Sequence, residues 1–433
     1  LFGGVLSRAR LSGRGSGAGN GLRLEWPPQS PFANLPQSES AGHRGRASRS
    51  ADALRVWVGV SRFAYNWALA EWKRQYQVGE KPSEVALRRQ LNSIKCQQFP
   101  WMRLVPKSVP QQAIKNCGAA FRRYFQKQSR YPKFKKKGVR DSARFENGPG
   151  TFEFAGKRVR LPVIGWVKLR EELRFSGKAL SATVRRVADR WFVSVSVEVD
   201  LPEPVRESQA AVGLDLGVST AATLSSGEKL PGPKALHAHL ERLQRLSRWH
   251  SRKKKGSNNR RKSAMRLARL HARISSVRQD WLHQTTTRLA REFAVIGIED
   301  LNVRGMMTNE KLARNIGDIG FHEFRRQLEY KSMLYGADLV TASRWFPSSK
   351  ICSACGRISE ELPLSLREWT CECGPFHDRD INAARNLRLY ALDRASCARI
   401  NACGEEGSDA GLTASVKPAS LKQESAMSYL GMD

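Results

Sequence analysis

This sequence contains few long apolar stretches. No run of about 18 apolar residues is present, which argues against a membrane-spanning helix. The N-terminal region also lacks an apolar core followed by a small-residue cleavage site, so we expect no Sec signal and a cytoplasmic protein. Hydrophobic residues nevertheless make up 40% of the 433 residues, which excludes a wholly disordered chain and predicts two or three domains.

Acidic residues are also scarce relative to basic ones. The chain has 40 Asp and Glu against 74 Lys and Arg, a formal net charge of +34. Such an excess repels itself unless a polyanion neutralises it, which favours nucleic acid as a partner and a nucleoid-associated location. An anionic membrane surface is the weaker alternative, and basic proteins without any catalytic activity also exist.

The acid deficit is greatest between Glu241 and Asp280, where no acidic residue occurs. This stretch includes SRKKKGSNNRRK, and a second basic segment, RYPKFKKKG, lies earlier in the chain. Phosphate is the obvious counter-charge, although a solvated basic face without a ligand is the alternative. The predicted nucleic-acid contacts are Lys253, Lys254, Lys255, Arg260, Arg261, Lys262, Lys135, Lys136 and Lys137.

Hydrophobic periodicity divides the chain into segments without internal repeats. Residues 1–50 form a Gly-, Ser- and Arg-rich leader that we expect to be disordered, and 51–130 have the pattern of amphipathic helices. Alternation in 131–204 predicts an antiparallel sheet or small barrel. Residues 205–395 alternate apolar strands with helices, which predicts an α/β domain, and the polar tail 396–433 is expected to be disordered.

Three acids stand at the borders of elements in the α/β segment. Asp215 lies in the apolar strand AVGLDLGV, Glu299 ends the strand VIGIED, and Asp380 opens a helix in HDRDINAA. Each of these acids alone is weak evidence for a catalytic site, because acids at such positions are usually solvated or cap a helix. Their order suits an RNase H-like α/β fold in which they converge to hold two Mg²⁺ ions, a site for metal-dependent phosphodiester hydrolysis.

Four of the eight cysteines are crowded into one short stretch. Cys352 and Cys355 form a CxxC pair, and Cys371 and Cys373 form a CxC pair after 15 intervening residues. This spacing predicts a four-cysteine zinc ribbon with a structural role, since four thiolates leave no open coordination position. His377 is a possible substitute ligand, and four unliganded reduced thiols are the alternative.

Several stretches together resemble the TnpB (OrfB) family of transposon-encoded RNA-guided nucleases, which is related to the type V CRISPR effectors. The similarity runs in family order from about Val56 to Asn386. The stretches that carry it include RFAYNWALAEW, ADRWFVSVSVE, GLDLGVSTAATLS, VIGIEDLNVRGMM, YGADLVTASRWFPSSKICSACG and CGPFHDRDINAARN. On this resemblance Asp215, Glu299 and Asp380 match the catalytic acids, and the four clustered cysteines match the zinc ligands.

The resemblance also implies a domain plan and partners. The plan is an α/β multidomain protein with a helical recognition bundle (51–130), a wedge β-barrel (131–204) and a RuvC nuclease domain (205–395) carrying the zinc-ribbon insert (345–378). It implies a guide RNA, double-stranded target DNA with a short adjacent motif, and Mg²⁺-dependent cleavage. Family members usually begin with a basic strand that completes the barrel, and we predict no such strand in LRLEWPPQSPFANLPQ.

The leading hypothesis is therefore an RNA-guided DNA endonuclease of a transposable element. A stand-alone miniature CRISPR effector would share its chemistry and differ in genomic context. A nuclease-inactive, RNA-guided DNA-binding repressor is a third possibility, which loss of one acid would favour, but all three acids are present. A plain basic nucleic-acid-binding protein leaves the ordered acids unexplained, and the zinc insert does not suit a DDE-type transposase.

Overall fold

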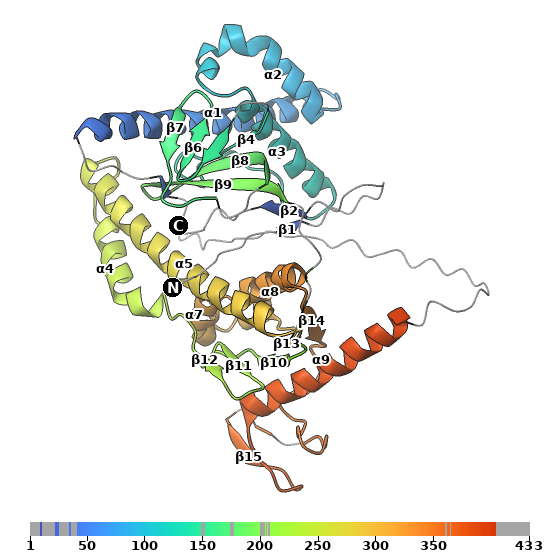
Figure 1. Cartoon of the computed structure of the whole chain (residues 1–433). Helices are drawn as coiled ribbons and strands as arrows, with labels where there is room; N and C mark the ends of the chain where they lie inside the picture. Colours follow the sequence, from blue (N-terminus) through green and yellow to red (C-terminus); the bar gives the residue numbers. More distant parts are fainter. Residues whose placement is uncertain are drawn as a thin grey trace, which may run out of the picture. The chain divides into compact units, whose positions relative to one another are not determined.

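A computed structural model describes residues 41–403, apart from 149–151, 174–176, 200–203, 205, 207, 360–361 and 364, together with three short strands nearer the N-terminus (Figure 1). Side chains are described from residue 50 to 396 outside these gaps. The described chain forms two compact units. Unit 1 takes in the residues up to Val58 and those from Arg140 to Arg399, and unit 2 runs from Gly59 to Val139. In the part of the chain described, every helix is too short or too polar to span a bilayer.

Unit 2 is a small helical unit built on aromatic packing. Ser83 caps the second helix by accepting a hydrogen bond from the backbone N–H of Ala86 at 3.1 Å. Trp72 stacks on Phe121 with ring centroids 4.3 Å apart, which joins the first and last helices. Its elements are the C-terminal part of α1 (Ala41–Gln77), α2 (Glu84–Gln98), η1 (Pro100–Leu104) and α3 (Ser108–Phe125).

Unit 1 contains two antiparallel sheets formed by the alternating sequence segments. The larger runs in the order β1-β2-β9-β8-β4, with β3 also paired to β9. The smaller has the order β5-β6-β7. The bounds are β1 Ala9–Arg10, β2 Leu22–Glu25, β3 Asn34–Leu35, β4 Ser142–Glu146, β5 Glu153–Ala155, β6 Arg158–Leu161, β7 Gly165–Lys168, β8 Lys178–Val187 and β9 Arg190–Val199.

The predicted disorder of residues 1–50 is wrong for the segments that the structure describes. β2 is the LRLE segment in which no strand was predicted, and it pairs antiparallel with β9, Leu22 opposite Val199. An unpaired edge of β9 presents N–H and C=O groups that a short extended segment can satisfy, a long-range effect that local composition does not reveal. α1 likewise begins at Ala41, and the last helix continues to Cys403, past the predicted start of the tail. The remainder of 1–50 and all of 404–433 lie outside the described residues.

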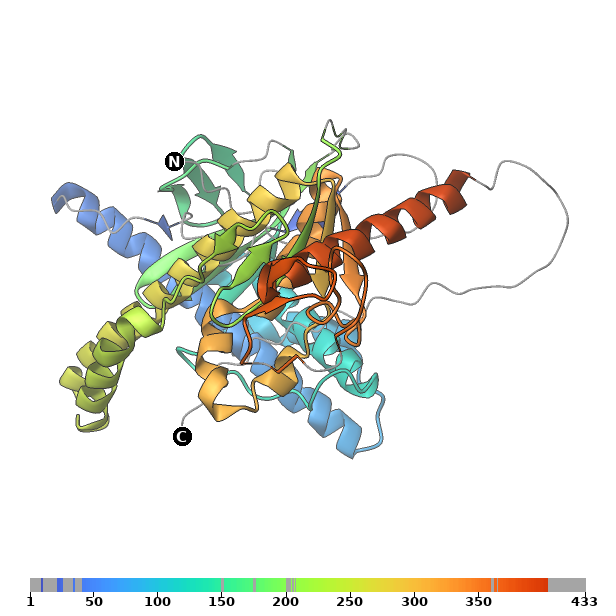
Figure 2. The same ribbon diagram turned by 90° about the horizontal axis from the view of Figure 1, so that it is seen from below.

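The second half of unit 1 is a five-stranded mixed sheet covered by helices on both faces (Figures 1 and 2). β10 and β13 are parallel neighbours, as are β13 and β14, whereas β11 runs antiparallel to β10. The strands, in the order β12-β11-β10-β13-β14, are β12 Lys229–Leu230, β11 Ala222–Leu224, β10 Ala211–Asp215, β13 Val295–Glu299 and β14 Asp338–Ala342. The near-continuous apolar sequences of β10 and β13 suit central strands that are buried on both faces.

Helices from distant parts of the chain form the two covering layers. Leu282 of α5 and Phe324 of α8 belong to the core cluster that also contains the β10 and β13 side chains. α9 lies on the opposite face (Figure 2). The helices are η2 His237–His239, α4 Leu240–Ser251, α5 Asn258–Glu292, α6 Val303–Met306, α7 Glu310–Ile319, α8 Phe321–Tyr335 and α9 Arg379–Cys403; the two-stranded sheet β15 Glu368–Thr370 and β16 Phe376–Asp378 precedes α9.

Two glycines set the distance between α9 and the sheet. A Cβ atom at Gly213 of β10 would lie 1.9 Å from the Ala384 carbonyl oxygen, and one at Gly297 of β13 would lie 2.3 Å from the Leu387 carbonyl oxygen. Backbone atoms of a helix cannot move aside as a flexible side chain can. The strand glycines therefore allow α9 to pack directly on the backbones of β10 and β13.

A buried lysine joins α5 to α8. Lys331 is fully buried, and its Nζ lies within hydrogen-bonding distance of the His283 carbonyl oxygen at 2.9 Å and of Thr286 and Thr287 Oγ1 at 2.6 and 2.8 Å. Burial lowers the pKa of Lys331 to about 6, with the positive charge of Arg326 acting in the same direction. The amine is therefore neutral in the folded protein at pH 7.

Gly297→Ala tests the contact between α9 and the sheet. We expect a destabilisation of about 2–3 kcal/mol, because the new methyl overlaps the backbone of α9. Urea unfolding measures this change. Gly59→Ala is the control, since its new Cβ meets nothing within 4 Å and sits inside helix α1, so it should stabilise by about 0.4–1 kcal/mol. Equal stability of Gly297→Ala and wild type would contradict close packing at this point.

Lys331→Met tests the buried amine through pH. Between about pH 6 and the ordinary lysine value of 10.5, the unfolded chain binds a proton that the folded chain does not. Wild-type stability therefore gains a contribution that rises with pH across this window. The variant lacks this contribution, so the difference between the urea midpoints of wild type and variant should change with pH. Lys311→Met, at an exposed position of α7, should keep the wild-type trend. Parallel profiles for wild type and Lys331→Met would rule out a neutral buried amine.

Candidate active site

Two of the three predicted acids end neighbouring parallel strands. Asp215 is the last residue of β10 and Glu299 the last of β13, and the residues before them, Leu214 and Ile298, are register partners. Adjacent strands lie about 4.8 Å apart, and equivalent positions point to the same face. The sheet therefore brings both carboxyl groups to one edge, although they lie far apart in the chain.

The third acid reaches this edge on α9. Asp380 is in the first turn of the helix, whose N-terminus is capped by Asp378: Oδ1 of Asp378 accepts hydrogen bonds from the backbone N–H groups of Asp380 at 3.0 Å and Ile381 at 3.1 Å. Lys229 of β12 forms an ion pair with Asp378 at 2.7 Å. Asp378 thus fixes the start of the helix, and the negative charge of the nearby Asp380 acts on Asp215.

The charges of the three acids are coupled. Burial raises the pKa of Asp215 well above its ordinary value, and the negative charges of Glu299 and Asp380 raise it further, while Arg379 and Arg367 partly oppose this. Burial also raises the pKa of Glu299, against a hydrogen bond donated by the hydroxyl of Ser348. Three converging carboxylates repel one another unless a cation lies between them. Their hard oxygen donors fit Mg²⁺.

The acids are nevertheless gathered less tightly than the cysteines. In the described part of the chain, the four cysteines are the one group of three or more candidate ligands whose donor atoms all lie within 4.8 Å of one another. Asp380 Oδ1 instead accepts a hydrogen bond from Arg367 at 3.4 Å. Arg367 and Ser348 are contacts of the acids that sequence reasoning missed, because nothing local marks an arginine or serine as a neighbour of a distant carboxylate.

Asp300, next to Glu299, has a different environment. Its carboxylate pairs with Arg325 of α8 and with Arg344, the latter at 3.0 Å. These cations neutralise Asp300, so it holds α8 and the segment after β14 together. Asp300 and Asp378 are thus both engaged in structural ion pairs.

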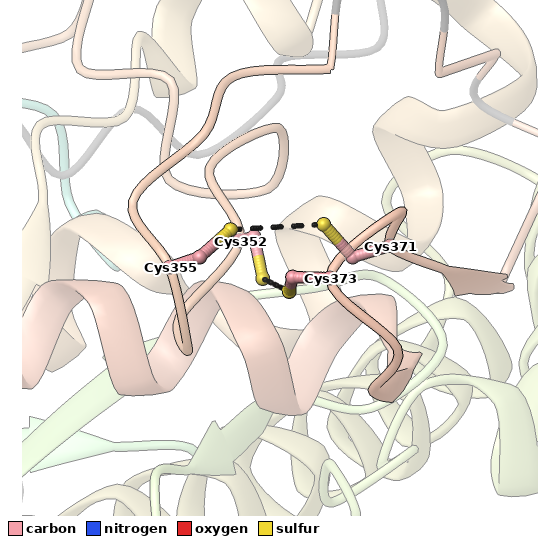
Figure 3. A group of neighbouring side chains, drawn as sticks. All are labelled: Cys352, Cys355, Cys371 and Cys373. Atoms are coloured by element: carbon pink, nitrogen blue, oxygen red, sulfur yellow. Dashed lines mark hydrogen bonds between the residues drawn. The ribbon is translucent and has the colours of Figure 1, made fainter.

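The cysteine cluster forms on two turns of similar design (Figure 3). Each pair is followed by a glycine with positive φ, Gly356 at 76° and Gly374 at 107°, whose N–H donates to the carbonyl oxygen of Cys352 or Cys371 at 2.9 Å. The sulfurs of Cys352 and Cys373 are 3.7 Å apart, and those of Cys355 and Cys371 are 3.8 Å apart. All four are free thiols at distances suited to one tetrahedral metal, which indicates a structural zinc site.

His377 contacts the cluster without joining it. Its Nε2 lies 3.1 Å from the sulfur of Cys352, whereas the group of potential ligands consists of the four cysteines. Although burial opposes it, backbone N–H groups of Cys355 and Ala354 and this histidine lower the pKa of Cys352 to about 6. A thiolate at neutral pH is the form that binds zinc. His377 therefore favours the thiolate form of Cys352. Cys371 and Cys373, the CxC pair, are the third and fourth members of the group of candidate ligands.

Two buried asparagines of α9 connect the cysteine cluster to the acid site. Asn382 Nδ2 donates to the Ile351 carbonyl oxygen at 2.7 Å, and its Oδ1 accepts from the Ser353 N–H at 2.9 Å. Asn386, one turn later, donates to the carbonyl oxygens of Ser348 and Ile351 at 2.8 and 2.7 Å. The helix that carries Asp380 thus also holds the segment that contacts Glu299 and leads into the cysteines.

The predicted nucleic-acid contacts divide into exposed and engaged side chains. In unit 1, Arg260 Nη1 donates to the carbonyl oxygens of His250 and Lys253 at 3.3 and 2.9 Å, so it closes the turn between α4 and α5. Lys253 lies over the ring of Trp249 at 4.8 Å. The exposed residues of this set are Lys254, Lys255, Arg261 and Lys262.

In unit 2, one lysine of the KKK run is engaged. The Lys135 ammonium lies 4.3 Å from the centre of the Tyr65 ring, and burial lowers the pKa of Lys135. Its backbone N–H donates to Asn66 at 2.8 Å. Lys136 and Lys137 are exposed. Side-chain exposure therefore separates two phosphate-accessible lysines from one that anchors the segment.

The double variant Cys352→Ser, Cys355→Ser tests the metal cluster. We expect zinc, about one ion per chain in the wild type, to be lost and the melting temperature to fall, because two oxygens replace two thiolates. Elemental analysis of the purified protein and thermal unfolding measure both effects. Cys96→Ser, at an exposed cysteine of α2, should leave zinc content unchanged. Full zinc occupancy in the double variant would refute the four-cysteine site.

Three family profiles match parts of the chain. A profile described as "Probable transposase" of the OrfB_IS605 family covers 194–310, which includes Asp215 and Glu299. A profile described as "Cas12f1-like, TNB domain" covers 321–387, which includes Asp380 and the four cysteines. A helix-turn-helix domain profile covers 50–81. The candidate acids and the cysteine cluster thus lie inside the matched regions.

Relatives that match most of the chain agree with these profiles. A Streptomyces pristinaespiralis protein named "Putative RNA-guided DNA endonuclease" is 40% identical over 353 residues, 79% of this chain and 82% of the relative. "Putative RNA-guided DNA endonuclease InsQ" of Escherichia coli K12 is 31% identical, covering 81% of this chain and 90% of the relative. The fold resembles Cas12f1 in its complex with sgRNA and target DNA, with a TM-score of 0.52, 14% identity, and coverage of 79% and 82% of the two chains. The chain belongs to the TnpB (OrfB) family.

Proposed function

We propose that this protein is an RNA-guided DNA endonuclease of a transposable element, with Asp215, Glu299 and Asp380 as its catalytic acids. The observation that carries the proposal is the approach of three acids from β10, β13 and α9 to one sheet edge, close enough for their charges to raise the pKa of Asp215. The names of the relatives support the activity. The presence of all three acids favours cleavage over a DNA-binding role alone.

The three carboxylates would hold two Mg²⁺ ions, which supply an activated water and stabilise the leaving oxygen of a phosphodiester. The rest of the site positions these acids. Ser348 orients Glu299 by donating its hydroxyl hydrogen, and Asp378 fixes the helix turn that carries Asp380. Arg367, with 64% of its side chain exposed beside Asp380, offers a cation to a phosphate of the bound strand.

Each segment of the chain would have its own role in binding guide RNA and cleaving DNA. Residues 205–395 would form the RuvC domain with the zinc ribbon 345–378 inserted, 131–204 the wedge barrel and 51–130 the recognition bundle. Guide RNA and a DNA duplex with a short adjacent motif are the partners, held largely through phosphates. Exposed cations on the α4–α5 turn, such as Lys255 and Arg261, suit this role, as does Lys136. Such an enzyme acts in the cytoplasm, with the nucleoid.

Asp215→Ala tests the catalytic assignment. Loss of one carboxylate undoes metal placement, which is worth several kcal/mol at the transition state, so we expect cleavage to slow by at least about a thousandfold. The measurement is Mg²⁺-dependent cutting of plasmid DNA that matches the RNA co-purified with the protein. Retention of that RNA should be nearly unchanged, because a carboxylate offers no positive charge to RNA phosphates.

Asp280→Ala is the matched control. This carboxylate on α5 accepts a hydrogen bond from Gln284 at 2.9 Å and is not among the charges that act on Asp215. Its removal should leave the cleavage rate close to that of wild type. Cutting by Asp215→Ala at the wild-type rate would remove Asp215 from the site, and a wild-type protein that binds no RNA would overturn the proposed function as a whole.

A further inference from the structure

One large apolar side chain near the acid site is almost wholly exposed. Trp345 has 87% of its surface accessible, more than any other large hydrophobic side chain described in the structure. Among the described residues its indole makes no aromatic or cation–π contact, and its backbone N–H donates to Ser343 Oγ at 3.4 Å. An indole left in water carries an apolar surface without a partner.

The segment around Trp345 is held in place. The Phe346 N–H donates to the Ser343 carbonyl oxygen at 2.9 Å, and the Ser348 N–H donates to the Phe346 carbonyl oxygen at 2.8 Å. The ring of Phe346 packs against Tyr390 of α9, with ring centroids 4.8 Å apart. The turn thus packs Phe346 against α9 and leaves the adjacent Trp345 exposed to solvent.

Two residues of this segment, Arg344 and Ser348, contact the last residue of β13 or the residue after it. Arg344 is bonded to Asp300, and Ser348 is bonded to Glu299. Trp345 is three residues from Ser348, a separation that the chain can span over at most about 10 Å. The exposed indole therefore lies near the edge that the three acids approach, and the preceding residue, Arg344, is partly exposed while paired with Asp300.

We propose that Trp345 is a stacking platform for an unpaired base of the DNA strand that enters the acid site. The proposal rests on the proposed function, since the carboxylates select a phosphodiester strand as the occupant of this edge. A flat indole stacks on any base, and an adjacent guanidinium suits the strand's phosphates. Trp345 then acts as a positioning residue that fixes the register of the strand relative to Asp215 and Glu299.

The main experiment combines side-chain and base removal. We expect Trp345→Ala to slow single-turnover cleavage about tenfold at unchanged guide-RNA retention and target binding, and Trp345→Phe to restore most of it, because stacking on an aromatic ring is worth about five- to hundredfold per base. Abasic sites are then placed one by one near the cut in the cleaved strand. An abasic site at one of these positions should slow cleavage by the wild type about tenfold. The same abasic site should not slow cleavage by Trp345→Ala any further.

The control is Trp166→Ala, which removes another exposed tryptophan from unit 1, on β7. In Trp166→Ala, the abasic site at that position should slow cleavage as much as it does in the wild type. Zinc content and melting temperature of each variant establish that the fold is preserved. An abasic profile that is identical in wild type and Trp345→Ala, or full activity of Trp345→Ala, would overturn the stacking role.

A second measurement does not depend on cleavage. A short fluorescent single-stranded DNA is bound to the protein without Mg²⁺ at about 0.5 M salt, where phosphate contacts are weakened and stacking persists. Trp345→Ala should bind it about fivefold more weakly, and an abasic strand should bind wild type and variant equally. Equal affinity of both proteins for the normal strand would point to a protein partner for the indole and overturn the proposal. Absence of cleavage by wild type would instead contradict the proposed function.

Discussion

The contact of α9 with the bare backbones of β10 and β13 supports the rest of the site. Gly213 and Gly297 remove the side chains that would otherwise separate helix and sheet, and the helix backbone occupies that space. The same helix carries Asp380 at its start and Asn382 and Asn386 along one face. A shift of α9 would therefore move the third acid and loosen the segment leading into the cysteine cluster together.

Pairing of charges distinguishes structural acids from candidate catalytic ones. Asp300 directly follows Glu299 in the sequence, and Asp378 is two residues before Asp380. Each of these two acids is nevertheless neutralised by a lysine or arginine. Asp215 is destabilised as an anion by burial and by two other negative charges, and its arginine neighbours only partly offset them. In a protein with a net charge of +34, a site where acids outweigh bases is an exception, which marks it as a candidate functional site.

Positive charge is also used in more than one way. Arg260 donates its guanidinium hydrogens to carbonyl oxygens at the α4–α5 turn, Lys135 lies over an aromatic ring, and Lys331 is buried as a neutral amine. Counting basic residues therefore overstates the surface available to phosphates. The exposed members of the same runs, such as Lys255 and Lys137, remain available for a polyanion.

The sequence by itself determined the strands, the helix start and the cysteine pairs on which the three candidate acids and the metal cluster are placed, because apolar strands, a helix start and metal-ligand spacing are local patterns. The tertiary structure alone decided that LRLE pairs with β9, that His377 supports a cysteine, and that Ser348 and Arg367 touch the acids. These relations join residues far apart in the chain. Periodicity and spacing report a residue's immediate neighbours, whereas sheet edges and helix packing create contacts that no local pattern encodes.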